Sequence, residues 1–417
     1  MITREDKEKM LYKIQDEVLQ SVDLDSNISD ERIMEFIEDC VLKIGHTVYL
    51  TIDEKREMVQ SIFNAIRKLD VLQEILEDSS ITEIMVNGPD HIFIERDGRV
   101  SAYPKAFLNK AKLEDVIQQI VSKVNRMVNE ANPIVDVRLL DGSRVNVVLP
   151  PIAIDGPVVT IRKFPEHPIT MEWLQEIGSI TEEAAVFLQT LVQAKYNIFI
   201  SGGTGSGKTT FLNALSAYIP KDERIITIED SAELQIHNVP NLVRLEVRNA
   251  NLEGKNEITI RDLIKSALRM RPDRIILGEV RDAAAYELLS VMNTGHDGSL
   301  STGHANSPRD MLKRLEALAL TAVDIPLMAV RSQIESALDI VVQLGRLRDK
   351  SRRVLEIDEV IGLRDGEICL QPLYKFVEDG QDTDNRIMGS LRPTDSQLCH
   401  REKLMSAGLH IAERKVR

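Results

Sequence analysis

Apolar side chains recur at three- and four-residue spacing, with charged residues between them, in the first part of the chain. These stretches cover residues 4–22, 28–44 and 52–68. The period is that of an amphipathic helix, and Ser29 and Thr51 stand where helix N-caps are expected. We therefore predict a helical segment over residues 1–69, with a role in packing or in docking to a partner.

From about residue 70 the apolar positions alternate with polar ones, which is the period of a half-buried strand. The alternating stretches are ITEIMVNG, HIFIERDGRV, DVRLLDGSRVNVVLPP and GPVVTIRKF, and a helical pattern near residues 111–129 lies among them. The pattern predicts a small α+β domain over residues 70–165. The proline-containing FPEHPIT at 164–170 predicts a linker after it.

Short apolar strands, each followed by a turn and a helical stretch, make up the next part of the chain. The strands are YNIFISG, ERIITIED and DRIILGEV. This alternation is typical of a doubly wound parallel sheet, which binds ligands at the carboxyl ends of its strands. We predict an α/β domain over residues 166–376 and a weakly patterned C-terminal appendix over residues 377–417.

The first of these strands runs into GGTGSGKTT, which satisfies the phosphate-loop pattern G-x-x-x-x-G-K-[ST]. Glycines let successive backbone N–H groups turn towards phosphates, and the following helix directs the positive end of its dipole at them. Lys208 would reach the β- and γ-phosphates, and the Thr209 hydroxyl would bind Mg²⁺. The predicted ATP and Mg²⁺ site consists of Gly202, Gly203, Thr204, Gly205, Ser206, Gly207, Lys208, Thr209 and Thr210.

Hydrolysis of ATP also requires a carboxylate near the metal and the attacking water. Strand ITIED ends at Glu229 and Asp230, with Glu233 close behind, and strand DRIILGEV leads to Glu279. Because the carboxyl ends of parallel strands meet at one edge of a sheet, we expect these acids beside the phosphate loop.

Two histidines, His296 and His304, stand in the stretch NTGHDGSLSTGHAN. Their spacing is not that of two ligands on one helix face, and no cysteine or third histidine is near in sequence, so a metal site has little support. A catalytic pair and an ordinary surface loop are the other two interpretations.

The charge balance and the cysteines narrow the choice of function. The 417 residues include 52 basic and 66 acidic side chains, for a formal net charge of −14, and 4% are aromatic. That composition disfavours a nucleic-acid motor, which holds phosphates with basic side chains and stacks bases on aromatic rings. Cys40, Cys369 and Cys399 are too scattered for a disulfide framework. The charged start and the short apolar runs predict neither a signal peptide nor a membrane-spanning helix.

The ordered motifs resemble those of the secretion ATPase superfamily, the motors of type II and type IV secretion and of type IV pili. The motifs are GGTGSGKTT, ITIEDSAELQ, RNANLEGKNEITIRDLIKSALRMRPDRIILGEVRD and NTGHDGSLSTGHANSPRDML. Within the superfamily, the chain is most similar to the CpaF-type ATPases of the tight-adherence (Tad/Flp) pilus, over most of residues 70–375. The resemblance implies an α/β, RecA-like ATPase domain preceded by a small α+β, PAS-like domain.

The same resemblance implies roles for the candidate residues. His296 and His304 would form the histidine box, which senses or positions the γ-phosphate. Glu229 would polarise the metal or the water and Glu279 would be the Walker B acid, although how these two divide the work stays open. The metal ligands would be Thr209, Glu229 and Asp230.

The resemblance also places arginines of the N-terminal domain at the nucleotide. Arg144 and Arg162 are the candidates here, with Arg138 as a third. Arg269 and Arg271 are weaker candidates from the second domain.

We expect a cytoplasmic ATPase, peripheral to the inner face of the plasma membrane, that works as a homo-hexamer. It would couple ATP hydrolysis to pilus assembly or protein secretion through a polytopic inner-membrane platform protein, and we expect no nucleic-acid partner. The competing hypotheses are a RecA-like nucleic-acid motor, an ATP-gated scaffold that does not hydrolyse ATP, and a soluble small-molecule kinase.

Overall fold

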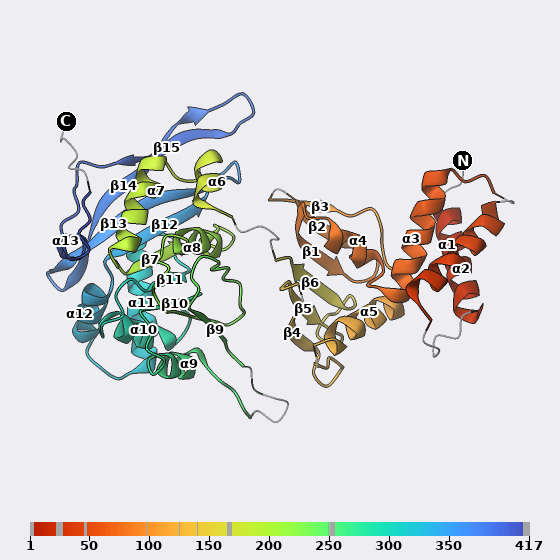
Figure 1. Cartoon of the computed structure of the whole chain (residues 1–417), viewed down its shortest axis with the longest axis horizontal. Coiled ribbons are helices and arrows are strands. Elements are labelled where there is room, and N and C mark those ends of the chain that lie inside the picture. The colour runs from red at the N-terminus through yellow and green to blue at the C-terminus, as the bar shows by residue number, and fades with distance from the viewer. Residues whose placement is uncertain are drawn as a thin grey trace. The chain divides into compact units, whose positions relative to one another are not determined.

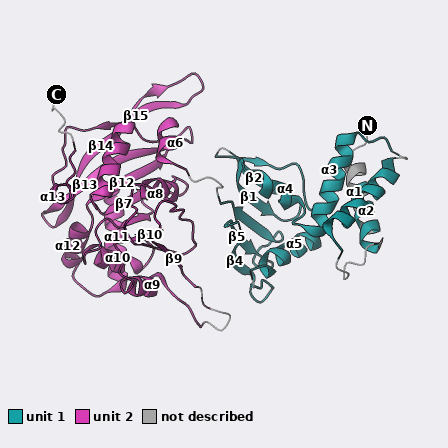
Figure 2. Ribbon diagram, in the orientation of Figure 1, with its two compact units in different colours: residues 1–166 teal, residues 167–417 magenta. Residues whose placement is uncertain are grey.

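The chain forms two compact units, Met1–Glu166 and His167–Arg417, and each is considered by itself (Figure 1 and Figure 2). The predicted linker at 164–170 falls largely on residues 165–168, which lie outside the part that the structure describes. The computed structural model describes residues 4–21, 28–45, 48–96, 98–124, 126–139, 141–164, 169–248, 250 and 255–411.

Unit 1 begins with three helices that share one apolar core. They are α1 (Arg4–Ser21), α2 (Asp30–Gly45) and α3 (Ile52–Arg67). Ile14, Ile33 and Met58 lie in this core and are fully buried. Thr51 caps α3 in a capping box, in which it accepts a hydrogen bond from the Glu54 N–H while the Glu54 side chain accepts one from the Thr51 N–H. The three helices predicted from the sequence are therefore confirmed.

The rest of unit 1, as far as the structure describes it, is an antiparallel sheet of six strands in the order β3-β2-β1-β6-β5-β4. Its strands are β1 (Ile81–Asn87), β2 (Ile92–Arg96), β3 (Arg99–Ala102), β4 (Ile134–Arg138), β5 (Arg144–Val148) and β6 (Val158–Arg162). Helices α4 (Val71–Glu77) and α5 (Lys110–Ser122) pack on the apolar face of the sheet, where Ile117 contacts the core that contains Val145 and Ile161. Helix α5 ends at Ser122 and is therefore shorter than the pattern predicted, and the Gln118 side chain donates a hydrogen bond to the Val128 carbonyl.

Unit 2 is built on a mixed sheet with nine strands among the described residues, in the order β15-β14-β13-β12-β7-β11-β10-β8-β9. The parallel strands are β7 (Ile198–Gly202), β8 (Ile225–Glu229), β9 (Leu242–Glu246), β10 (Arg274–Leu277), β11 (Leu300–Gly303) and β12 (Ile340–Arg346). The antiparallel strands beside β12 are β13 (Arg352–Arg364), β14 (Glu367–Gln381) and β15 (Ile387–Pro393).

Helices cover both faces of this sheet, because successive residues of its central strands point into two different cores. Ile198 and Ile200 of β7 face one core and Phe199 faces the other. The first core contains α6 (Met171–Glu176), α7 (Glu182–Gln193), α8 (Lys208–Ser216) and α13 (Glu402–Ser406). The second contains α9 (Ile260–Ala267), α10 (Ala284–Met292), α11 (Pro308–Ala322) and α12 (Leu327–Ala337). No helix in the described ranges is long and apolar enough to cross a membrane.

Two parts of unit 2 differ from the sequence expectation. Leu300–Gly303, within the Gly-, Ser- and Thr-rich stretch, is not a loop but the fully buried strand β11 between β7 and β10. The Ser301 and Thr302 hydroxyls donate to the carbonyls of Leu277 and Gly278, which is how polar residues fit inside the sheet. The boundary expected at residue 376 falls inside β14, so the chain beyond it continues the sheet.

A buried ion pair links several segments of unit 2 at the amino ends of the strands. Arg274 is 0% exposed, and its Nε and Nη2 lie 2.5 and 2.9 Å from the two carboxylate oxygens of Glu223. Its Nη1 donates to the carbonyls of Val192 and Gly298, so this side chain joins three segments.

We predict that Glu223→Gln lowers the free energy of unfolding of unit 2 by about 3 to 5 kcal/mol, because it leaves the buried Arg274 charge uncompensated. Urea unfolding followed by the fluorescence of Trp173, the one tryptophan of the chain, measures the change. Glu378→Gln is the control, since it removes the partner of the exposed Arg348 and should cost about 1 kcal/mol or less. A loss below about 1 kcal/mol for Glu223→Gln would contradict the structural role of this pair.

Candidate functional site

The loop between β7 and α8 has the backbone of a phosphate cradle. Gly207 stands at the N-cap of α8 with φ 92°, a conformation that favours glycine. A Cβ at Gly202 would lie 2.5 Å from Ser206 Oγ and 2.7 Å from the Leu344 carbonyl oxygen, so only glycine fits there. No heavy atom lies within 4 Å of the position that a Cβ would take at Gly203 or Gly205. The loop therefore opens onto space at the start of a helix, which is the arrangement that holds phosphates.

Lys208 is the first residue of α8, and its ammonium group is already engaged. The side chain is buried, with 7% of the residue exposed. Its Nζ donates to the Gly203 carbonyl at 3.0 Å and lies 3.2 Å from His304 Nδ1. The lysine thus links the phosphate loop to the residue that follows β11.

His304 connects Lys208 to Glu279. Its Nε2 lies 3.0 Å from Glu279 Oε1. Burial and the neighbouring Lys208 ammonium hold the pKa of His304 below its ordinary value. With a lysine donor at Nδ1, these contacts assign a neutral imidazole that carries its proton on Nε2 and donates it to Glu279.

The second carboxylate oxygen of Glu279 contacts Arg281, a residue for which the sequence predicted no role. Arg281 Nη2 lies 2.7 Å from Glu279 Oε2, and Arg281 Nη1 lies 3.4 Å from Asp230 Oδ2. One guanidinium thus joins the acids that follow β10 and β8. The series Lys208, His304, Glu279, Arg281 and Asp230 runs along the carboxyl edge of the parallel strands.

Glu229 lies at the same edge but faces inward. The residue is 3% exposed, and its Oε2 accepts hydrogen bonds from the backbone N–H groups of Glu233 and Leu234 at 2.7 and 2.8 Å. Its Oε1 is buried without a hydrogen-bond partner among the described residues. Burial raises the pKa of Glu229 to about 7, although the two amides act in the opposite direction. The structure therefore brings Asp230 and Glu279 together through Arg281 and gives Glu229 a separate, drier environment.

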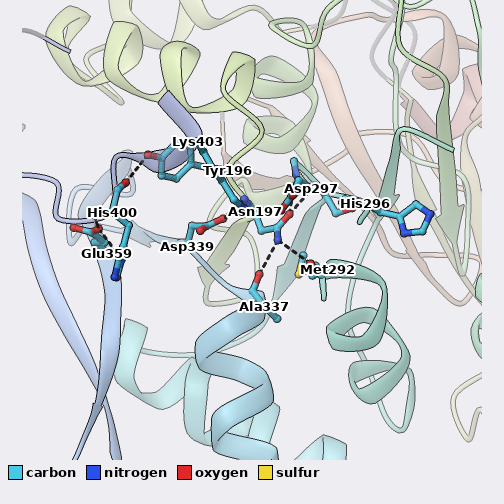
Figure 3. Close-up of polar contacts among 12 residues, drawn as sticks. Tyr196, Asn197, Met292, His296, Asp297, Ala337, Asp339, Glu359, His400 and Lys403 are labelled. Carbon is cyan, nitrogen blue, oxygen red and sulfur yellow. Dashed lines mark hydrogen bonds and ion pairs between the residues drawn. The ribbon is translucent and has the colours of Figure 1, made fainter. Parts of the chain in front are cut away.

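His296 and His304 lie at opposite edges of the sheet, because the whole of β11 separates them. His296 belongs to the turn before β11, near Asn197 and Asp297, and Figure 3 shows its ring directed away from Asn197. Its Nδ1 is buried and has no hydrogen-bond partner among the described residues. Within unit 2 the structure brings His304, but not His296, to Lys208.

The turn that contains His296 is held by a polar cluster at the amino edge (Figure 3). Asn197 Oδ1 accepts from the N–H groups of Gly298 and Ser299, and its Nδ2 donates to the Ala337 carbonyl. Lys403 of α13 forms ion pairs of 2.7 Å with both Asp297 and Asp339. These contacts fix the strand starts, so His296 stands on the rigid side of the sheet.

The three candidate arginines of unit 1 form a row across neighbouring strands. Arg138 of β4 pairs with Arg144 of β5, which pairs with Arg162 of β6. Their strand neighbours Val145 and Ile161 point into the core, so the arginines lie on the other face. Like charges placed directly opposite each other are destabilising, and an anion on that face would relieve the repulsion.

The two weaker arginine candidates lie elsewhere. Arg269 and Arg271 precede β10, at the amino edge of the sheet, and the structure does not bring them to the phosphate loop. Arg352, at the start of β13, does contact that loop: its Nε donates to the Gly205 carbonyl at 2.9 Å. The only sequence signal for Arg352 is a basic pair before an apolar strand, and strand order is needed to place it.

The described residues contain no group of three or more His, Cys, Asp and Glu side chains arranged to hold a metal ion. A Mg²⁺ ion held by few protein ligands and by the nucleotide's own phosphates is compatible with that. Of the three predicted metal ligands, Thr209 lies in the first turn of α8 and Asp230 follows β8, whereas the Glu229 carboxylate is turned inward onto backbone N–H groups.

Comparison with known proteins agrees with this geometry. Residues 66–405 match the family model described as type II/IV secretion system protein. The chain belongs to that family. It is 35% identical over 294 residues to a putative conjugal transfer protein of Mycobacterium tuberculosis, covering 69% of this chain and 83% of that protein. It is 30% identical over 328 residues to the type IV secretion system protein VirB11 of Bartonella henselae, covering 70% of this chain and 92% of that protein.

A solved structure supports the fold. The ATPase DotB of Yersinia pseudotuberculosis is similar with a TM-score of 0.52 and 18% sequence identity, over 70% of this chain and 78% of that one. The predicted fold class, a RecA-like α/β domain preceded by an N-terminal part, is thereby confirmed.

The raised pKa of Glu229 makes the stability of this secretion ATPase depend on pH. In the folded state the pKa of Glu229 lies above the ordinary 4.5. Its contribution to the free energy of unfolding is therefore fully present below about pH 4.5 and is lost as the pH rises to about 7. The glutamine of the Glu229→Gln variant cannot ionise. Over that pH window the free energy of unfolding of the variant should therefore rise by about 3 kcal/mol relative to that of the unmodified chain. Urea unfolding at a series of pH values, read from Trp173 fluorescence, tests this, and a pH-independent difference would contradict it.

Proposed function

We propose that the chain is an ATP-hydrolysing motor that works as a homo-hexameric ring at the cytoplasmic face of the inner membrane. The observation that carries the proposal is the run of contacts from Lys208 through His304 to Glu279, beside an open phosphate loop. A binding site alone needs the lysine and the loop. A site for hydrolysis also needs an acid whose position responds to the phosphates, and this run of contacts supplies one.

The proposed response begins at Lys208. On nucleotide binding its ammonium turns from the Gly203 carbonyl and from His304 Nδ1 to the phosphates. His304 Nδ1 then lacks its lysine donor, and the imidazole is able to move with the γ-phosphate and to release Glu279. The Glu279 carboxylate, still oriented by Arg281, becomes available to the attacking water. Mg²⁺, held by Thr209 and Asp230, would neutralise charge on the phosphates when it is bound.

The arginine row of unit 1 supports a second part of the proposal. Arg144 and Arg162 would stabilise the negative charge that develops on the transferring phosphoryl group, with Arg138 as the third member of the row. An arginine supplied by a separate domain makes hydrolysis conditional on domain movement, and this is how a motor converts chemistry into displacement.

The machine that the motor serves is proposed from two kinds of similarity. The motif series favours assembly of a tight-adherence (Tad/Flp) pilus through a polytopic inner-membrane platform protein. Conjugal transfer is the second candidate, since a relative of that description is matched over 83% of its length. The residue roles proposed above are the same for either machine, because they concern ATP hydrolysis and not the partner.

We expect the ATPase rate per chain to rise with protein concentration, together with the appearance of a six-fold species measured by native mass. The physical reason is that, in the proposed ring, neighbouring copies of the chain complete each site, so a monomer should be inactive. Glu279→Gln should assemble and bind ATP but hydrolyse it at least about 100-fold more slowly, because it lacks the carboxylate. A rate that is independent of concentration in a monomer would exclude the ring mechanism.

Arg144→Ala is expected to lower kcat by about 100-fold or more while leaving the thermal midpoint nearly unchanged. The side chain is 40% exposed, and its one charged partner among the described residues is Asp136 at 3.4 Å, so its loss costs little stability. Arg99→Ala, an exposed arginine on β3 of the same sheet, is the matched control. If both variants hydrolyse ATP at the normal rate, Arg144 has no part in the reaction.

A further inference from the structure

The phosphate loop has a second basic contact, on the side where its carbonyl groups point. Arg352 Nε donates to the Gly205 carbonyl at 2.9 Å. The stem of the same side chain crosses Gly207, since Arg352 Cδ lies 3.6 Å from the position that a Cβ of Gly207 would take. Arg352 therefore spans the loop from Gly205 to Gly207, the N-cap of α8.

The backbone around Arg352 is fixed by its neighbours. Strand β12 pairs with β7 up to the phosphate loop, where Leu344 lies opposite Gly202, and β13 pairs in turn with β12. The carbonyl of Arg352 accepts a hydrogen bond from Ser179 Oγ at 2.5 Å, and the N–H of Val354 donates to the Ser179 carbonyl at 2.9 Å. Because Ser179 is 6% exposed, this anchor is shielded from water. The guanidinium is thus delivered to the loop by a rigid strand.

Two basic side chains bind carbonyl groups of the loop, Lys208 at Gly203 and Arg352 at Gly205, and nucleotide binding should affect these two contacts differently. When N–H groups of a loop converge on phosphates, the intervening carbonyls point outward. The Gly203 carbonyl is held by Lys208 and by the Ser206 hydroxyl, and the Lys208 contact must break when the ammonium reaches a phosphate. The Gly205 carbonyl is held by Arg352 from outside, and this contact can persist in the bound state.

We propose that Arg352 is a positioning residue of the phosphate loop. By holding the Gly205 carbonyl outward, it keeps the loop N–H groups directed at the phosphates before nucleotide arrives, so that less conformational freedom is lost on binding. The inference rests on the proposed nucleotide function and adds to it a determinant of affinity that lies 147 residues after Gly205 of the motif.

The test is nucleotide affinity in the full-length protein, measured as fluorescence of mant-ADP with Mg²⁺. Arg352→Gln should raise the dissociation constant about five- to tenfold, as expected for loss of one charge-assisted hydrogen bond at an exposed position. Arg352→Lys should restore part of the affinity, since it keeps the charge but loses the planar donor group. Arg348→Gln is the matched control, an arginine of the same hairpin whose partner is Glu378, and it should bind mant-ADP normally.

Two further measurements separate loop positioning from other roles. Competition with inorganic pyrophosphate should show the same loss of affinity as mant-ADP, because the loop holds phosphates and not the base. In ATP turnover, KM should rise by a larger factor than kcat falls. The unfolding midpoint of the nucleotide-free variant should match that of the unmodified chain, which excludes misfolding as the cause.

The outcomes that overturn the inference are distinct from those that overturn the function. Normal mant-ADP binding by Arg352→Gln, or a defect for mant-ADP that pyrophosphate does not share, would remove Arg352 as a loop-positioning residue. If the unmodified chain itself fails to bind mant-ADP, the proposed ATPase function fails, and this inference fails with it.

Discussion

The ammonium group of Lys208 is the charge around which the carboxyl edge of unit 2 is organised. A buried ammonium is stable only where acceptors surround it, and the Gly203 carbonyl and His304 Nδ1 are two of them. Because His304 accepts from the lysine, its other nitrogen must be the donor, and Glu279 receives that hydrogen bond. A single buried charge therefore sets the tautomer of the histidine and the orientation of the acid.

The polar groups at the two edges of the sheet differ in the number of partners they hold, although each edge also has a buried atom without a partner among the described residues, His296 Nδ1 at the amino edge and Glu229 Oε1 at the carboxyl edge. At the amino edge, Asn197, Arg274 and Lys403 each satisfy several partners at once, which rigidifies the strand starts. At the carboxyl edge, Glu229 keeps one buried oxygen without a partner among the described residues, and Lys208 holds contacts that phosphates would replace. An unsatisfied buried group has a free-energy cost, and such costs are concentrated at sites that change state.

The sequence predicted the elements whose signals are local. The strand–loop–helix around Lys208 and the three N-terminal helices follow from apolar periodicity and glycine spacing, and both are as expected. Strand β11 was missed because Gly is depleted in strands and Leu300 is the one large apolar residue of the stretch, so no apolar or alternating run marks it. Its place between β7 and β10 shows only in the strand order. That omission also hid the separation of the histidines, since four strand residues span about 13 Å. Arg352 could not be found because nothing in its own segment indicates which strand lies beside β7.

Net charge was the least informative property of the sequence for this site, and the structure explains why. The total of −14 describes the whole surface, whereas a phosphate responds to the charges within about a Debye length. In unit 1, the strand register places Arg138, Arg144 and Arg162 side by side on one face. In unit 2, the start of α8 collects Lys208 and Arg352 at the phosphate loop. Positive charge is thus concentrated locally within each unit, and at the carboxyl edge of unit 2 it lies beside acids that are themselves paired with His304 and Arg281. An acidic chain can therefore still direct basic groups at an anionic substrate.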